Sequence, residues 1–173
     1  GALSAQPPQW PVSTSDLSRV IIDLQFRPQG LLKNFQGQRH VRLELLDYPG
    51  EWLLDLPLLG MTFGQWCEQM RALLDAEPRA SLAGDLRERL LAIDPAPACD
   101  ADLLKQLTEE WTAFLLRCRS EAGLSRNQPG RFMLPGSGIA PQMLMFVPLL
   151  GANQYSQGAA GSWWEQCRER FDY

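Results

Sequence analysis

The sequence predicts an α/β protein, in which an antiparallel pair of strands precedes a bundle of about three helices and a second mixed segment. Two short runs near the start alternate apolar and polar residues, which is the period of a strand with one buried face. Three later segments carry apolar stripes at helical spacing, and Pro and Gly then become frequent again. These changes predict three regions, at residues 1–60, 61–125 and 126–173.

The two alternating runs predict a half-buried, antiparallel strand pair. The first run starts at Val20 and the second ends at Asp47. The apolar positions are Ile22, Leu24 and Phe26 in the first run and Val41, Leu43 and Leu45 in the second. The linker between the runs is too short for the helix that joins parallel strands, so the pair is predicted to be antiparallel.

Three helices are predicted in the middle region. Thr62 and Gln65 form a capping box for the first helix. A stripe of apolar residues across Leu82–Ile93 marks the second helix, and either Asp100 or Asp102 can cap the third. Because all three stripes are apolar, the helices are expected to pack together.

The last region is predicted to hold two short strands, Arg131–Leu134 and Met143–Val147, bracketed by Pro and Gly. Ser162, with Glu165 three residues later, is typical of a helix N-cap. That predicted helix reaches the end of the sequence, and the first residue is glycine. The chain is therefore expected to be an internal fragment of a longer protein.

Composition argues against several functional classes. The 16 Lys and Arg residues are outnumbered by 20 Asp and Glu residues, so the chain has no positive excess for binding nucleic acid. His40 is the single histidine and the four cysteines form no Cys-x-x-Cys pair, which argues against zinc. The longest apolar run after residue 132 is too short to cross a bilayer, so no transmembrane segment is predicted. Because no signal peptide precedes the four cysteines, they are expected to be reduced thiols in a cytoplasmic protein.

The strand that ends at Asp47 runs into a D-x-x-G motif with Gly50, followed by Glu51. An Asp at the carboxyl end of a strand can hold Mg²⁺ in phosphoryl-transfer proteins. A glycine three residues later allows a backbone N–H to approach a phosphate, and the next side chain can orient water. The alternative is a Pro-Gly turn in which Asp47 and Glu51 cap the next helix.

Residues around this motif resemble the YcjX-like family, a group of predicted P-loop NTPases that are also described as stress proteins. The resemblance covers the segment DYPGEWLLDLP at residues 47–57. It extends to PQWP at 8–11, QPGRFMLPG at 128–136 and RERF at 168–171. The matching segments span nearly the whole chain in order and spacing, and the helical region is the least distinctive part.

The resemblance implies a partial P-loop GTPase-like core with an inserted helical bundle. It implies hydrolysis of GTP or ATP with Mg²⁺ in the full-length protein, in a regulatory or stress-related switch. The Walker A loop that holds the phosphates is absent here, because the only lysines, Lys33 and Lys105, do not follow a glycine. The fragment alone is therefore expected to be inactive.

The same resemblance extends the predicted site. Asp47 is the predicted metal ligand and Glu51 the catalytic residue, while Gly50 and Thr14 are predicted to bind nucleotide. For Thr14 the favoured alternative is that residues 13–15 only solvate a loop. Asp55, in the same segment, is expected to cap a helix or to pair within it. Arg131 is expected either to contact phosphates or, as the favoured alternative, to pair with a carboxylate.

The implied partners are the nucleotide and an inner-membrane protein of the YcjF type, which would place the protein at the periphery of that membrane. One alternative is a non-catalytic helical interaction module that binds a partner through Trp66 or Trp111. Another is a cysteine hydrolase that uses His40 beside a thiol.

Overall fold

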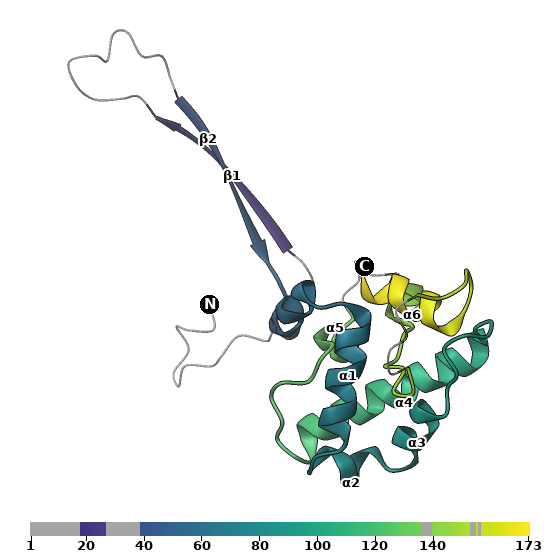
Figure 1. Ribbon diagram of the computed structural model, residues 1–173. Coiled ribbons are helices and arrows are strands. Elements are labelled where there is room, and N and C mark those ends of the chain that lie inside the picture. Colours follow the sequence, from purple (N-terminus) through teal and green to yellow (C-terminus); the bar gives the residue numbers. More distant parts are fainter. Residues whose placement is uncertain (1–17, 27–38, 136–139, 153–154, 156) are drawn as a thin grey trace. The chain divides into compact units, whose positions relative to one another are not determined.

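The computed structural model describes residues 18–26, 39–135, 140–152, 155 and 157–173. The chain divides into two compact units, Gly1–Pro49 and Gly50–Tyr173. Both predicted boundaries, after residues 60 and 125, fall inside the second unit. The fold is mixed, with a two-stranded sheet in the first unit and helices in the second (Figure 1).

The first unit contains a β-hairpin. Strands β1 (Ser18–Phe26) and β2 (Arg39–Asp47) pair antiparallel, with Val20 opposite Leu45. The predicted antiparallel pair is therefore confirmed. Both strands extend slightly beyond the alternating residues that predicted them.

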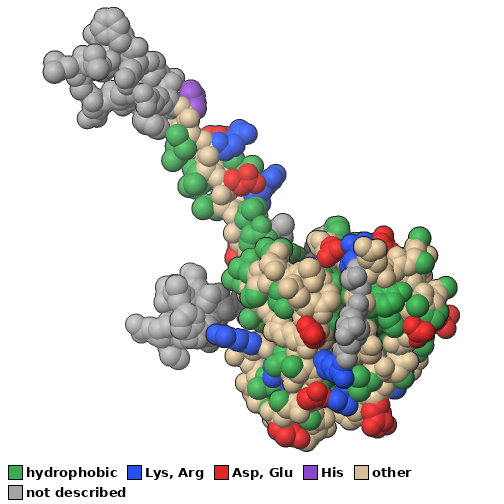
Figure 2. Space-filling view, viewed as in Figure 1, with side chains coloured by type: hydrophobic (Ala, Val, Ile, Leu, Met, Phe, Trp, Pro, Cys, Tyr) green, Lys and Arg blue, Asp and Glu red, His purple; other side chains and the backbone are tan. Residues whose placement is uncertain are grey.

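The two faces of the hairpin differ in chemistry. Directly opposed residues share a face, so the three central pairs of one face are apolar and the other face carries two ion pairs. Figure 2 shows charged side chains gathered along one side of the hairpin and apolar ones along the other. The residues of the apolar face are Val20, Ile22, Leu24, Val41, Leu43 and Leu45.

The prediction that one strand face would be buried is wrong. The six apolar side chains are between 38% and 55% exposed. Alternation in a sequence reports that the two faces are chemically distinct, but it does not report whether another element covers either face. We call these six residues the apolar hairpin face.

The second unit begins with η2 (Gly50–Gly60), a 3₁₀ helix, followed by α1 (Phe63–Leu74). The predicted capping box is confirmed, because the Gln65 amide N–H donates to Thr62 Oγ1 and the Gln65 side chain accepts from the Thr62 amide. Two orphan amides at the start of α1 are thus satisfied.

The predicted second helix is interrupted. Two short helices, α2 (Arg79–Ala83) and α3 (Asp85–Leu91), flank Gly84, whose φ is +50°. This backbone conformation cannot continue a right-handed helix, although the apolar stripe runs through it. The sequence pattern located the buried face and missed the break.

The third predicted helix is confirmed as α4 (Ala101–Ser120). Asp100 caps it, since its carboxylate accepts hydrogen bonds from the amides of Asp102 and Leu103 at 3.0 Å each. Helices α2 and α3 both pack against α4.

The two short strands predicted after residue 126 are wrong. The structure has α5 (Gly130–Met133) and the 3₁₀ helix η3 (Pro141–Leu144) in that region. Phe146 and Val147 are fully buried in the loop that follows η3. A short apolar run flanked by Pro and Gly fits a buried turn as well as a strand, because both lack a longer period.

The last helix, α6 (Trp163–Phe171), starts as predicted, with Ser162 Oγ accepting from the Glu165 amide. It ends before the final two residues of the chain. Among the described helices, none has the length and apolar character needed to cross a membrane.

An aromatic cluster forms the core of the second unit. Trp66 is fully buried, and its ring lies 5.3 Å from Phe171, 5.5 Å from Phe146 and 6.4 Å from Trp111. Trp111 is 1% exposed. The two tryptophans are therefore core residues, and the alternative in which they dock an external partner is wrong for this conformation.

Candidate functional site

The D-x-x-G motif spans the end of β2 and the start of η2. Asp47 is the last residue of β2, and Gly50 and Glu51 are the first residues of η2. Thr14 lies outside the described residues. Gly50 and Glu51 are thus neighbours at one helix start, in the second unit, while Asp47 ends the hairpin of the first unit.

Gly50 has open space around it. A Cβ atom at this position would meet no described atom within 4 Å, and the backbone φ is not positive. Neither packing nor backbone strain among the described residues requires glycine here. The open backbone is compatible with the close approach of a phosphate that the motif predicts.

Glu51 is held by the helical region. Its Oε1 accepts a hydrogen bond from Arg119 Nη1 on α4 at 3.0 Å, and the Glu51 side chain is 18% exposed. This ion pair fixes one carboxylate oxygen of the predicted catalytic residue. The sequence did not indicate any contact between α4 and the motif.

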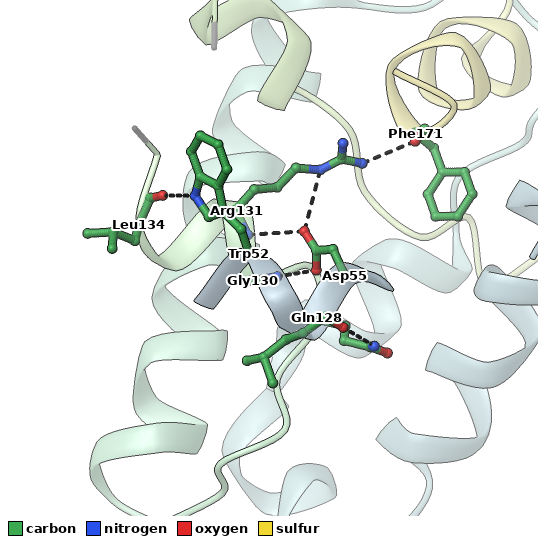
Figure 3. Close-up of polar contacts among 8 residues, drawn as sticks. Trp52, Asp55, Gln128, Gly130, Arg131, Leu134 and Phe171 are labelled. Carbon is green, nitrogen blue, oxygen red and sulfur yellow. Dashed lines mark hydrogen bonds and ion pairs between the residues drawn. The ribbon is translucent and has the colours of Figure 1, made fainter. Parts of the chain in front are cut away.

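The main polar contacts of η2 are with residues 128–134, shown in Figure 3. The Trp52 indole N–H donates to the Leu134 carbonyl at 2.7 Å. The Gln128 side-chain amide donates to the Leu54 carbonyl at 2.5 Å. We call the contact between residues 51–55 of η2 and residues 128–134 the motif clasp.

Asp55 is at the centre of the motif clasp. Its two carboxylate oxygens accept hydrogen bonds from the amides of Gly130 at 2.6 Å and Arg131 at 3.2 Å. Arg131 Nε lies 3.8 Å from Asp55 Oδ2, and an Arg131 Nη2 hydrogen donates to the Phe171 carbonyl at 3.1 Å. The favoured expectation that Arg131 pairs with a carboxylate is therefore confirmed.

Burial sets the electrostatics of this pair. The side chains of Asp55 and Arg131 are 17% and 15% exposed. Desolvation raises the pKa of Asp55 despite the two amide hydrogen bonds and the nearby guanidinium, which act in the opposite direction. Desolvation also lowers the pKa of Arg131, although that group stays protonated in proteins. The Arg131 guanidinium also lies 5.2 Å from the Phe146 ring centroid.

Sequence reasoning treated Asp55 and Arg131 separately and missed their contact with each other. Three of the four segments that carry the family resemblance meet here, because Asp55, Arg131 and Phe171 belong to different ones. Their presence in distinctive segments was the one available signal. Hydrogen bonds between a carboxylate and a distant backbone leave no periodic pattern in a sequence.

The cysteines do not support the hydrolase alternative. Burial raises the pKa of the Cys67 thiol above its ordinary range and that of Cys167 to about 12. A neutral, buried thiol is a poor nucleophile. Within the described part of the chain, no three His, Cys, Asp or Glu residues are grouped so as to hold a metal ion.

Magnesium would need a different kind of site, built from one or two carboxylates and the phosphates of its nucleotide. Asp47, a carboxylate at the end of a strand, fits such a site by the chemistry of its oxygen atoms. The Asp47 side chain is thus of the chemical type that magnesium prefers as a ligand.

Comparison with known proteins identifies the family of this chain. All of residues 1–173 match the YcjX-like family, DUF463, and the chain belongs to that family. It is 35% identical to a protein named Ras-like GTPase YcjX from Escherichia coli strain K12, over 99% of this chain and 38% of that protein.

A second relative has the same name. The Ras-like GTPase YcjX of Shewanella oneidensis strain MR-1 is 37% identical over 86% of this chain and 31% of its own length. The chain thus spans roughly a third of the length of these curated relatives. The resemblance inferred from the four sequence segments is confirmed.

Proposed function

We propose that the chain is part of a Mg²⁺-dependent GTPase, in which the Asp47–Glu51 segment is the nucleotide-responsive switch. The observation that carries the proposal is the D-x-x-G segment at a strand end, with open space at Gly50, in a chain whose relatives are named Ras-like GTPases. Those names favour GTP over the alternative, ATP. The Walker A loop and the rest of the P-loop core would lie outside residues 1–173.

Each residue of the segment has a distinct proposed role. Asp47 holds the metal, and the Gly50 amide donates to a phosphate. Mg²⁺ supplies charge neutralisation on the phosphate oxygens when it is bound. Glu51 orients the attacking water through the carboxylate oxygen that Arg119 does not occupy. Thr14 is a proposed second contact to the nucleotide site.

The proposal also covers residues 1–173 alone. Anion binding in P-loop proteins depends mostly on the backbone amides and lysine of the phosphate loop, and the sequence contains no such loop. We expect this chain to bind no GTP at micromolar concentrations. The YcjF-type partner and the stress-related role stay predictions of the family resemblance.

A metal-dependence experiment tests the proposal in a protein that has the length of the curated relatives. Asp47→Ala should lose most of the Mg²⁺-dependent affinity for GTP, measured by calorimetry with and without the metal. Asp23→Ala is the matched control, because Asp23 is also an exposed hairpin carboxylate and has no proposed role in the nucleotide site. Unchanged Mg²⁺-dependent binding in Asp47→Ala would overturn the metal assignment.

A further inference from the structure

The start of η2 lies unusually close to α5. A Cβ atom built on Gly130 would be 1.9 Å from the Glu51 carbonyl oxygen and 2.8 Å from the Glu51 carbonyl carbon. No side chain fits at that distance, so residue 130 must be glycine for the two backbones to approach each other. The backbone of the proposed water-orienting residue is therefore in direct contact with α5.

Asp55 joins η2 to the start of α5 through hydrogen bonds. Helix α5 starts after Pro129, which provides no side-chain cap. Asp55 supplies the missing cap from 75 residues away in the sequence, because its carboxylate accepts from the first two amides of α5. One side chain of η2 thus holds the helix start against which Glu51 packs.

We infer that Asp55 is a positioning residue, which fixes the backbone of Glu51 against Gly130 and thereby sets the direction of the Glu51 carboxylate. This inference rests on the proposed function, since it assigns Asp55 a role through Glu51. Asp55 itself is turned toward α5 and Arg131 (Figure 3).

The hold on Glu51 has two parts. Gly130 limits where the Glu51 backbone can lie, while Arg119 holds its side-chain carboxylate at 3.0 Å. A displacement of about 1 Å in a group that orients a reactant can cost roughly 100-fold in rate. Loosening the motif clasp should therefore lower turnover without weakening the binding of GTP.

The experiment uses a protein with the length of the curated relatives and two variants that loosen the clasp differently. Asp55→Asn replaces one of the two carboxylate oxygens that accept from the α5 amides with an NH₂ group, which cannot accept. Gly130→Ala pushes the Glu51 carbonyl away while the Asp55 carboxylate remains. Both should lower kcat at least 10-fold and leave KM for GTP within about 2-fold, since only the orientation of Glu51 changes.

Two matched controls share the same substitutions. Asp75→Asn changes a carboxylate that pairs with Arg87 at the end of α1, outside the motif clasp. Gly60→Ala adds a methyl group where no atom lies within 4 Å of the new Cβ. Both controls should keep the kcat of the unmodified protein. An equal loss of kcat in the controls would overturn the inference.

A second readout requires no hydrolysis. In residues 1–173, hydrogen exchange at the amides of Gly130 and Arg131 should accelerate in Asp55→Asn and stay slow in Asp75→Asn.

If exchange accelerates while kcat remains unchanged in both clasp variants, the positioning role is overturned and the proposed function stands. If the unmodified protein does not hydrolyse GTP, the proposed function fails, whereas slow exchange at the two amides would still show the clasp. Should Asp55→Asn fail to fold, Gly130→Ala decides the kinetic question.

Discussion

The hairpin and the helical unit use apolar residues in opposite ways. In the helical unit, side chains such as Trp66, Phe146 and Leu90 are fully buried. In the hairpin, the apolar hairpin face is between 38% and 55% exposed, although its residues are as hydrophobic as those of the core. The stability of residues 1–173 should therefore come mainly from the helical unit.

Substitutions that truncate an apolar side chain to alanine should separate the two regions most strongly. Trp66→Ala would leave a cavity between four aromatic rings and should lower the free energy of unfolding by about 3–5 kcal/mol. Ile22→Ala, on the apolar hairpin face, should cost less than about 1 kcal/mol. Urea unfolding followed by near-ultraviolet circular dichroism measures both, and equal losses would contradict the comparison.

The buried pair of the motif clasp should give a smaller effect that depends on pH. Burial raises the pKa of Asp55 above its ordinary value of 3.8, so the folded state retains this proton better than the unfolded state. The stability that this carboxyl contributes is fully present below about pH 3.8 and is lost as pH rises through its folded pKa.

The measurement is the free energy of unfolding of the unmodified chain minus that of Asp55→Asn, followed from pH 3.5 to pH 7. The other carboxyl groups are the same in both proteins, so their contribution to the pH dependence cancels in this difference. It should decrease with rising pH, by no more than about 1.4 kcal/mol per pH unit. A difference that increases with pH would show that Arg131 and the two amides outweigh burial.

The ion pairs on the charged hairpin face should give the smallest effect. Arg42 donates two hydrogen bonds to Asp23, at 2.9 Å and 3.3 Å, but both side chains are more than 60% exposed. Arg42→Gln should cost at most about 1 kcal/mol, and added salt should reduce the difference. Thermal unfolding at low and high salt checks this, and a large, salt-independent loss would imply that the hairpin is buried in solution.

The sequence predicted those elements whose cause is local. The β1–β2 pair follows from alternation and a short linker, and three helix starts follow from the caps Thr62, Asp100 and Ser162. Each of these signals lies within a few residues of its effect. The break at Gly84 was missed because one glycine does not disturb an apolar stripe enough to be distinguished from a tolerated helical glycine.

The parts that the sequence did not predict depend on distant contacts. Residues 131–134 look like a short strand, yet most of them belong to α5, whose first two amides, of Gly130 and Arg131, donate to Asp55 in η2. The Arg119–Glu51 pair joins residues 68 positions apart. Neither contact has a spacing rule, so only the folded structure reveals that the segments at residues 47–57 and 128–136 contact each other.

The central claim is that Glu51 orients water in the switch, and one variant tests it most directly. Glu51→Gln, in a protein with the length of the curated relatives, should hydrolyse GTP roughly 10- to 1000-fold more slowly, with GTP affinity nearly unchanged. Loss of the ion pair with Arg119 should cost at most about 1 kcal/mol of stability in either case, and if Glu51 only pairs with Arg119 the variant should keep its rate per folded molecule. A folded Glu51→Gln protein with unmodified turnover would contradict the account.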